Sequence, residues 1–467
     1  MTRFAWPRDA ALSVMAMLAL NASAVAAQDS AFPLGTRLSE TATDRMAADG
    51  VAGAVIVLLR DGRAVWIGTF GMADPASGRP MTEDAVFRVE SLSKPVTAWG
   101  AMRLAETGRL DLDAPAADCL RRWRPPEGAP PFTARQLLSH TAGIGLGDFT
   151  ERYAPDADRP DLPHHLDRDF ETVSAPEARF AYSDTGYNLL ELLIEDCTDE
   201  DFAEVVEREV FEPLGMQTAT YDWPGPDMPV GHDLRGRPVA PYVYPGRASG
   251  GVFATANDFA RLAAAGMTGS RQSVLSKEGL ATLHRPDVAV GGLFAFAADG
   301  YALGHFTETL SDGRQAVWHG GQGYGWMSHM HLVPETGDGI VILSNSQRAW
   351  PLFAALLRDW SESLGVAPIG MTRVLLAETA ARITIVLALA AAVFGVRFAC
   401  ARRRPRAIRI AAGIVATVLI GWPLWAAAQT YLFLFSILPG LWPWLAGASG
   451  LAGHGLASVA LMPKRDR

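Results

Sequence analysis

Three long apolar stretches near the C-terminus constrain the fold of this chain more than any other feature. They cover residues 383–399, 408–428 and about 441–462, and the chain from about 381 to 462 is almost uncharged outside one basic cluster. Such stretches are typical of transmembrane helices, because a helix satisfies its own backbone hydrogen bonds in lipid. Apolar helices packed inside a soluble core are the alternative.

The N-terminal segment has the pattern of a secretory signal peptide. Arg3 lies near the start, an apolar run covers residues 10–20, and an Ala-x-Ala site ends at Ala26 or Ala27. An uncleaved anchor is the alternative. The basic clusters at 401–406 and 464–467 are expected to face the cytoplasm, which requires an odd number of crossings if the preceding part is exported. The sequence therefore predicts a protein of the bacterial inner membrane with its globular part on the periplasmic side.

We expect four parts: a signal peptide at 1–27, a globular domain at 28–366, a linker at 367–380 and about three transmembrane helices at 381–467. The globular part begins with strand-like runs at 51–59 and 64–70, joined by an Asp-Gly hairpin signal. Strand character returns after residue 300, a closing helix is expected at 349–364, and the region between 109 and 300 is mostly helical. These patterns predict an α+β fold, in which helices flank an antiparallel sheet built from both ends and a helical subdomain is inserted between them.

One serine and one lysine stand where a strand-like run meets a helix-like run. The apolar run ends at Val89, a helix is expected from Ser91 to Thr107, and the i, i+3 spacing puts Lys94 on the same helix face as Ser91. A serine needs a neighbouring base to become a nucleophile, and a lysine whose pKa is lowered can serve as that base. A surface lysine in the first turn of a helix is the alternative, but the chain contains only three lysines.

Further motifs resemble the serine β-lactamase and penicillin-binding protein superfamily. Residues 180–189 resemble its Tyr-x-Asn element, with Tyr182 as the tyrosine, and residues 318–325 are similar to its third element. Residues 137–143 and 249–256 resemble two structural signatures of the class C branch, and the match covers about residues 40–360. Within the superfamily the chain is similar to class C β-lactamases, D-aminopeptidases and esterases of the same fold.

This resemblance implies an acyl-enzyme mechanism that uses no metal or other cofactor. Ser91 would attack the carbonyl, while Lys94 and Tyr182 share the base and acid roles, with nearby positive charge lowering the pKa of Tyr182. Gly321 would let the substrate approach the backbone closely. The oxyanion hole would come from the N–H groups of Ser91 and Gln322.

Two residues differ from the family pattern and bear on the substrate. His319 stands where β-lactamases and penicillin-binding proteins carry a lysine, so a permanent positive charge for an anionic substrate is missing; we expect His319 to orient the substrate. Asp184 stands where asparagine is usual. It is expected to keep Lys94 protonated, which would give Tyr182 more of the base role, or to attract a substrate amine.

The prediction is a membrane-anchored, esterase-like serine hydrolase that acts on a small ester, amide or D-amino-acid peptide. A D-amino-acid peptidase or β-lactamase is one alternative, and a non-catalytic sensor of peptidoglycan fragments is another. Membrane lipid is the expected partner of the C-terminal helices, and a net charge of −9 argues against nucleic acid.

Cysteines and histidines outside these motifs leave two questions open. Cys119 and Cys197 are able to pair in an oxidising compartment if the geometry permits. The pair His164 and His165 lacks a recognised zinc spacing and is interpreted as part of a solvated loop. The pair at positions 329 and 331 also lacks such a spacing and is interpreted as part of a strand face.

Overall fold

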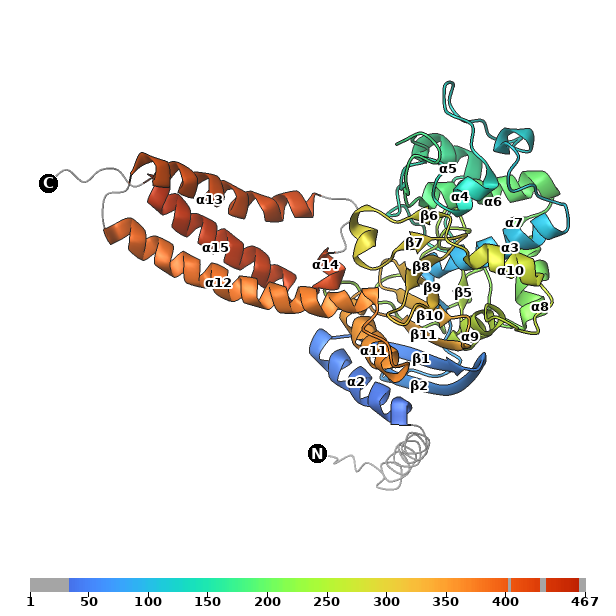
Figure 1. The fold of residues 1–467 in the computed structure, drawn as a ribbon, viewed down its shortest axis with the longest axis horizontal. Coiled ribbons are helices and arrows are strands. Elements are labelled where there is room, and N and C mark those ends of the chain that lie inside the picture. The colour runs from blue at the N-terminus through green and yellow to red at the C-terminus, as the bar shows by residue number, and fades with distance from the viewer. Residues whose placement is uncertain (1–32, 402–404, 429–433, 462–467) are drawn as a thin grey trace, which may run out of the picture.

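The computed structural model describes residues 33–401, 405–428 and 434–461. The predicted signal peptide at 1–27 therefore lies outside the described residues. Figure 1 shows a globular part and, projecting from it, a bundle of long helices formed by the C-terminal segment.

The globular part is built on a nine-stranded antiparallel sheet with the order β3-β2-β1-β11-β10-β9-β8-β7-β6. Its centre joins the two ends of the globular chain, because β1 (Gly53–Arg60) pairs with β11 (Asp338–Ser344). This arrangement confirms the predicted α+β class with an antiparallel sheet. The remaining strands are β2 (Arg63–Asp74), β3 (Arg79–Pro80), β6 (Val288–Ala289), β7 (Gly300–Tyr301), β8 (Phe306–Thr309), β9 (Gln315–Gln322) and β10 (Met327–Val333); β4 (Phe87–Arg88) and β5 (Phe253–Ala254) form a separate pair.

The predicted hairpin between β1 and β2 is present. Arg60 pairs with Arg63, and the two residues between them, Asp61 and Gly62, have φ angles of 52° and 68°. Two successive positive φ angles are typical of a type I′ turn, which Asp-Gly favours.

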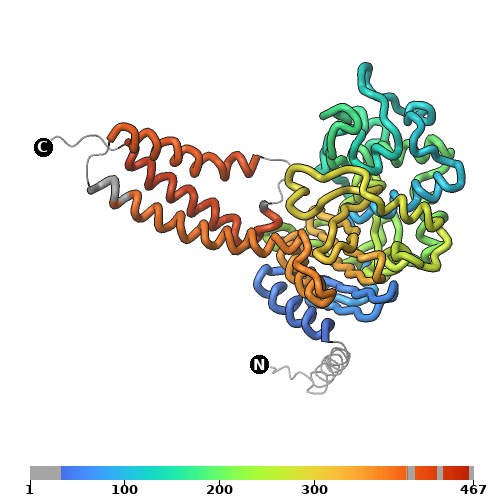
Figure 2. The backbone as a smooth tube through the Cα atoms, in the orientation of Figure 1, coloured from blue at the N-terminus to red at the C-terminus, as the bar shows by residue number. Residues whose placement is uncertain are grey.

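Both faces of the central strands are buried, as their continuous apolar sequences require. Ile56 and its alternate neighbours pack against helices α2 (Pro33–Asp49) and α11 (Trp350–Ser363). Val57 and its neighbours face the other core, which contains α3 (Ser93–Glu106) and α9 (Ala256–Ala265). Figure 2 shows α2 and α11 side by side, although they come from opposite ends of the globular chain.

The region between β2 and β6 contains the predicted helical insertion. Capping boxes at Thr133 and Thr255 start α4 (Ala134–Leu138) and α9, because each threonine side chain accepts a backbone N–H three residues on. Cys119 and Cys197 form a disulfide, with their Cα atoms 5.3 Å apart. The other helices of the insertion are α5 (Leu162–Asp169), α6 (Asp184–Thr198), α7 (Phe202–Val206), α8 (Glu212–Leu214) and α10 (Lys277–His284).

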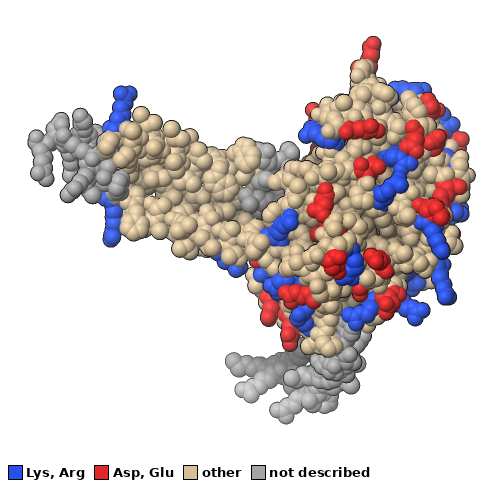
Figure 3. Space-filling view, in the orientation of Figure 1, with Lys and Arg blue, Asp and Glu red and all other residues tan. Residues whose placement is uncertain are grey.

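The C-terminal segment forms α12 (Arg373–Ala401), α13 (Arg406–Ala427), α14 (Leu434–Ile437) and α15 (Trp442–Leu461). Two stretches, Gly370–Gly395 and Arg406–Ala427, are long and apolar enough to cross a membrane, while α15 packs against both α12 and α13 without meeting that criterion. The expected linker at 367–380 is mostly helical instead, because α12 starts at Arg373 and its first turn packs in the sheet core through Val374. Figure 3 shows a nearly uncharged bundle beside a globular part covered by charges of both signs.

Candidate active site

Ser91 lies in a short 3-10 helix, η1 (Glu90–Leu92), between β4 and α3. Glu90 has a left-handed backbone conformation with a φ of 53°, which turns the chain from the strand into the helix. Ser93 holds this turn, because its hydroxyl donates to the carbonyl of Glu90 at 2.7 Å and accepts the N–H of Val252 at 3.0 Å. Ser91 is thus placed at the junction that the sequence predicts.

Lys94 contacts the hydroxyl of Ser91 from the first turn of α3. The side chain is fully buried, and its Nζ lies 3.2 Å from Ser91 Oγ. Nζ also donates to Asp184 Oδ1 at 2.6 Å and to the carbonyl oxygen of Ser249 at 2.8 Å. Burial lowers the pKa of Lys94 below its ordinary value, although the charge of Asp184 opposes this effect. A buried lysine with a lowered pKa beside a serine has the geometry of a general base.

Tyr182 completes the predicted trio but has a different electrostatic state from the one expected. Lys94 Nζ lies 4.8 Å from the centre of the Tyr182 ring. Burial raises the pKa of Tyr182 well above its ordinary value, the charge of Asp184 adds to this rise, and a hydrogen bond with Ser91 opposes it. The expectation that positive charge lowers this pKa is therefore wrong, because burial and the charge of Asp184 both raise it. Tyr182 stays a neutral phenol that can donate or pass on a proton.

His319 also lies beside Ser91, where it is buried and uncharged. Burial lowers its pKa well below the ordinary value, and the charge of Lys94 contributes. Its Nδ1 is 2.8 Å from the carbonyl oxygen of Gly320 and its Nε2 is 3.2 Å from the hydroxyl of Tyr301. In the neutral ring Nδ1 donates and Nε2 accepts, so both nitrogens are already occupied by the protein. His319 therefore supplies neither a cation nor a free hydrogen-bonding group.

Gly321 and Gln322 lie at the end of β9, next to η1. A Cβ on Gly321 would lie 2.3 Å from the carbonyl oxygen of Val89 and 2.3 Å from Ser328 Oγ, so only glycine allows this approach. The side-chain carbonyl of Gln322 accepts the indole N–H of Trp350 at 2.7 Å. β9 thus runs beside the nucleophile as expected, and the use of the Gln322 N–H as an oxyanion donor stays a prediction.

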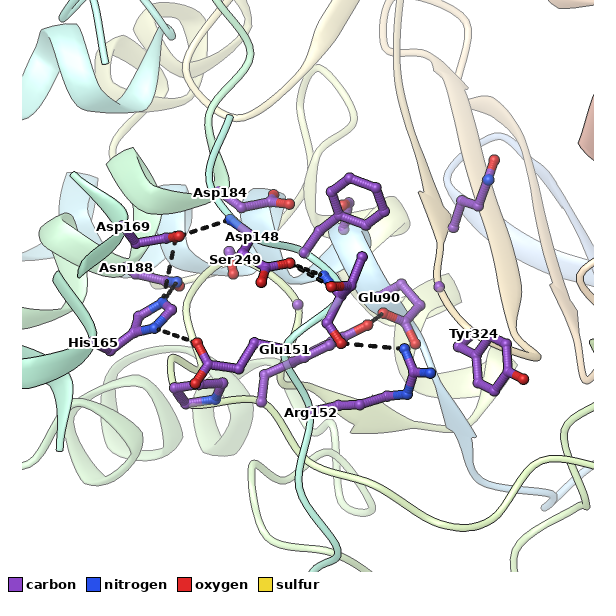
Figure 4. Close-up of a pocket in the computed structure, with 18 of the residues that line it drawn as sticks. Glu90, Asp148, Glu151, Arg152, His165, Asp169, Asp184, Asn188, Ser249 and Tyr324 are labelled. Atoms are coloured by element: carbon purple, nitrogen blue, oxygen red, sulfur yellow. Dashed lines mark hydrogen bonds and ion pairs between the residues drawn. The ribbon is translucent and has the colours of Figure 1, made fainter. Parts of the chain in front are cut away.

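Ser91 borders two cavities of opposite character. The larger, about 340 Å³, has mostly acidic groups among its charged lining residues. Figure 4 shows carboxylates spread around it, with Arg152 at one side. The smaller, about 80 Å³, also borders Tyr182 and His319 and is otherwise lined largely by aromatic and aliphatic side chains. The acidic residues of the larger cavity are Glu90, Asp148, Glu151, Asp169 and Asp184.

A buried network beneath the nucleophile escaped the sequence analysis. Glu90 Oε1 is 3.1 Å from Nε of Arg88 and accepts the hydroxyl of Tyr242 at 2.8 Å, while Oε2 accepts the hydroxyl of Tyr244 at 2.9 Å. Arg88 stacks over both rings, 4.4 and 4.6 Å from their centres. The signal in the sequence is an arginine and a glutamate within an otherwise apolar run, directly before the serine. This network fixes the turn from which Ser91 projects.

Two of the histidines singled out in the sequence, His165 and His331, lie close to carboxylates of the protein. His165 lies on helix α5 and is buried, so the expected solvated loop is wrong there; its Nδ1 is 3.0 Å from Glu151 Oε2. His331 lies in β10, where its Nε2 is 3.1 Å from Glu308 Oε1. Across residues 33–401, 405–428 and 434–461, no three His, Cys, Asp or Glu side chains are grouped to hold a metal ion.

Comparisons with known proteins agree with this geometry. Residues 38–359 match the family model described as Beta-lactamase. Esterase EstB from Burkholderia gladioli is 33% identical over 199 residues, which are 39% of this chain and 50% of the esterase. Penicillin-binding protein 4 from Amycolatopsis lactamdurans is 28% identical over 340 residues, which are 66% of this chain and 84% of that protein.

A solved structure with the same fold is the octameric penicillin-binding protein homologue from Pyrococcus abyssi. It superposes with a TM-score of 0.63 at 26% identity, over 71% of this chain and 78% of that one. The chain thus spans half of the esterase and most of the two penicillin-binding relatives.

Proposed function

This chain belongs to the β-lactamase family and is a serine hydrolase, and from that premise we propose that it cleaves an ester or amide through an acyl-enzyme on Ser91. The observation that carries the proposal is the 3.2 Å contact between Ser91 Oγ and the Nζ of a fully buried lysine. Serine becomes nucleophilic when such a base accepts its proton.

The proposed reaction has two halves. In the first, the Lys94 amine takes the hydroxyl proton of Ser91, Oγ bonds to the substrate carbonyl carbon, and the carbonyl oxygen becomes an oxyanion near the N–H groups of Ser91 and Gln322. Tyr182 passes a proton to the departing oxygen or nitrogen as its bond to carbon breaks. In the second half, the Lys94 amine takes a proton from water as the water oxygen bonds to the acyl carbon. The bond from this carbon to Ser91 Oγ then breaks, the carboxylic acid leaves, and Lys94 returns the proton to Oγ.

Two features favour an esterase over a β-lactamase. His319 is neutral, so the charge that would hold a substrate carboxylate is missing. Five carboxylates and one arginine line the larger cavity beside Ser91, and although some of these carboxylates are ion-paired, the excess of acidic groups disfavours an anionic substrate. Esterase EstB, a relative that covers part of this chain, supports the same preference.

Paired assays of the full chain in detergent test this proposal. We expect a short-chain p-nitrophenyl ester to be hydrolysed, a chromogenic cephalosporin to be hydrolysed at least 100-fold more slowly, and Ser91→Ala to reduce ester turnover by about 10³-fold or more. Lys94→Arg should be as inactive as Lys94→Ala, because arginine does not deprotonate. Efficient cephalosporin turnover would overturn the esterase preference. No turnover of any substrate together with no labelling of Ser91 by an active-site serine probe would favour the sensor alternative.

The carboxylates also favour a second candidate, a peptidase for substrates with a free amino group. Asp184 and its acidic neighbours can attract an ammonium group near the scissile bond. This candidate predicts that D-amino-acid amides outcompete acidic peptides, and equal turnover of the two would exclude it.

The proposed location is the inner membrane, with the globular part in the periplasm. Helices α12 and α13 expose many large apolar side chains, including Leu387 and Ile414, and contact of such side chains with water is unfavourable. The disulfide between Cys119 and Cys197 suits an oxidising compartment. Both features support the proposed anchor and its orientation.

A further inference from the structure

The smaller cavity beside Ser91 is an apolar cleft with walls from three parts of the chain. Ser91, Tyr182 and His319 line one portion of it. Leu293 and Phe296 of the short 3-10 helix η4 (Gly292–Phe296) also line it and remain 60% and 42% exposed. Since exposed apolar side chains border the cleft, an apolar group can continue from Ser91 to the protein surface.

The third wall comes from the C-terminal segment, outside the family match at 38–359. Met371, Val374 and Ile437 contribute it, from the turn before α12, from α12 and from α14. Helix α12, which carries exposed apolar side chains, therefore also shapes the cleft at the nucleophile.

Specific contacts hold this wall in place. Arg373 Nη1 donates to the carbonyl of Phe296 at 2.8 Å, which ties α12 to η4. The N–H of Gly370 donates to Glu308 Oε2 at 2.9 Å, and a Cβ at Gly370 would lie 2.3 Å from the carbonyl oxygen of Ala297. These contacts fix the C-terminal wall against the globular part, so the cleft has a defined shape.

We propose that this cleft holds the acyl chain of the substrate, and that the substrate is an ester of a fatty acid. The inference rests on the proposed acyl-enzyme, in which the acyl group stays attached to Ser91 while the leaving group departs. The apolar cleft suits the chain, and the larger acidic cavity, which Ser91 also lines, suits a polar or cationic leaving group. The first carbons fill the 80 Å³ of the cleft, and the rest of the chain lies over Leu293 and Phe296.

Chain-length profiles of the full-length protein test the assignment. With p-nitrophenyl acetate, butyrate and octanoate, kcat/KM should rise by about fourfold for each methylene that becomes buried. Val374→Trp, which narrows the cleft, should bring the octanoate-to-acetate ratio of kcat/KM back towards one. Leu376→Trp places the same side chain on α12 at a position that is 70% exposed and does not line the cleft, and should keep the wild-type ratio.

A second variant covers the case in which Val374→Trp does not fold. Leu293→Asp puts a charge at an exposed position of the cleft and should lower the octanoate-to-acetate ratio by at least fivefold. A wild-type ratio near one, or an unchanged ratio in both folded cleft variants, would overturn the fatty-acyl assignment. Ser91-dependent acetate turnover in that case would leave the proposed hydrolase intact, whereas no Ser91-dependent turnover of any ester would overturn both proposals.

Reconstitution distinguishes two sources of the acyl chain. Fatty acid released from phosphatidylglycerol vesicles by the wild type, but not by Ser91→Ala, would assign the chain to a membrane lipid. Octanoate turnover without such release would assign it to esters dissolved in water.

Discussion

At the scale of single residues, two opposing effects act on the pKa of Lys94. Complete burial disfavours its charged form, while the carboxylate of Asp184, 2.6 Å from Nζ, favours it. The pKa of Lys94 lies below its ordinary value because burial is the larger effect. Asp184 thus raises the pKa of Lys94 without outweighing the effect of burial, so Lys94 can still act as the base. The neutral Tyr182 can transfer protons.

Asp184→Asn should therefore change the pH dependence of ester hydrolysis. The active form carries a neutral Lys94, so kcat/KM is lost as the pH falls through the pKa of this lysine. Removing the neighbouring negative charge lowers that pKa further, and the acidic limb should move to lower pH by about one pH unit or more. Asp148→Asn, which removes a carboxylate from the same cavity, should leave the midpoint of this limb in place. A limb that does not move in Asp184→Asn would show that Lys94 is not the base.

At the scale of helices and strands, Glu90 lies where β4, the helical segment that carries Ser91 and the loop before β5 meet. The residue follows β4, with Val89 between them, turns the chain with a positive φ and begins η1, the helical segment that carries Ser91. Its carboxylate joins Arg88 to the two tyrosine hydroxyls from the loop before β5. A buried ion pair of this kind does little for stability as a whole, but the loss of one partner leaves the other charge uncompensated.

Glu90→Gln is expected to destabilise the protein by ~3–5 kcal/mol, because Arg88 would keep its charge in a buried site without a counter-ion. Thermal or denaturant unfolding of the purified full chain measures this loss. Glu83→Gln removes an exposed carboxylate from the same stretch and should unfold like the wild type. Replacing both Arg88 and Glu90 by glutamine should recover part of the stability; a double variant no more stable than Glu90→Gln would contradict the explanation.

At the scale of the whole molecule, the C-terminal helices are continuous with the globular core. Ile369, Met371 and Val374 are buried in the same core as α2 and α11. Arg45 of α2 also contacts Glu378 of α12, with 3.0 Å between Nη2 and Oε1. The first turns of α12 therefore belong structurally to the globular part.

Truncated chains should separate the stabilising contacts of the first turns of α12 from membrane binding. A chain ending at residue 366 should be less stable than one ending at 380 by several kcal/mol, since burial of each lost apolar side chain is worth ~1.5–3 kcal/mol. The chain ending at 380 should remain folded and leave the membrane fraction, whereas the full chain should sediment with membranes after alkaline carbonate washing. Equal stability of the two truncated forms would show that the contacts of α12 contribute nothing.

Much of the fold could be predicted from local pattern. The turn at Asp61 and Gly62, the capping boxes at Thr133 and Thr255, and the helix after Ser91 all depend on side chains close to one another in sequence. The site motifs were equally local, which is why the contact of Ser91 with Lys94 could be predicted from a spacing of three residues.

The identity and order of most elements, and the residues able to do the chemistry, followed from local sequence patterns alone. The tertiary structure alone decided the electrostatic state of these residues, because a pKa depends on burial and on charges brought together from distant segments. The phenol of Tyr182 and the imidazole of His319 are neutral for this reason. The cleft beside Ser91 was also decided by tertiary structure, since its walls come from residues as far apart as Leu293 and Ile437.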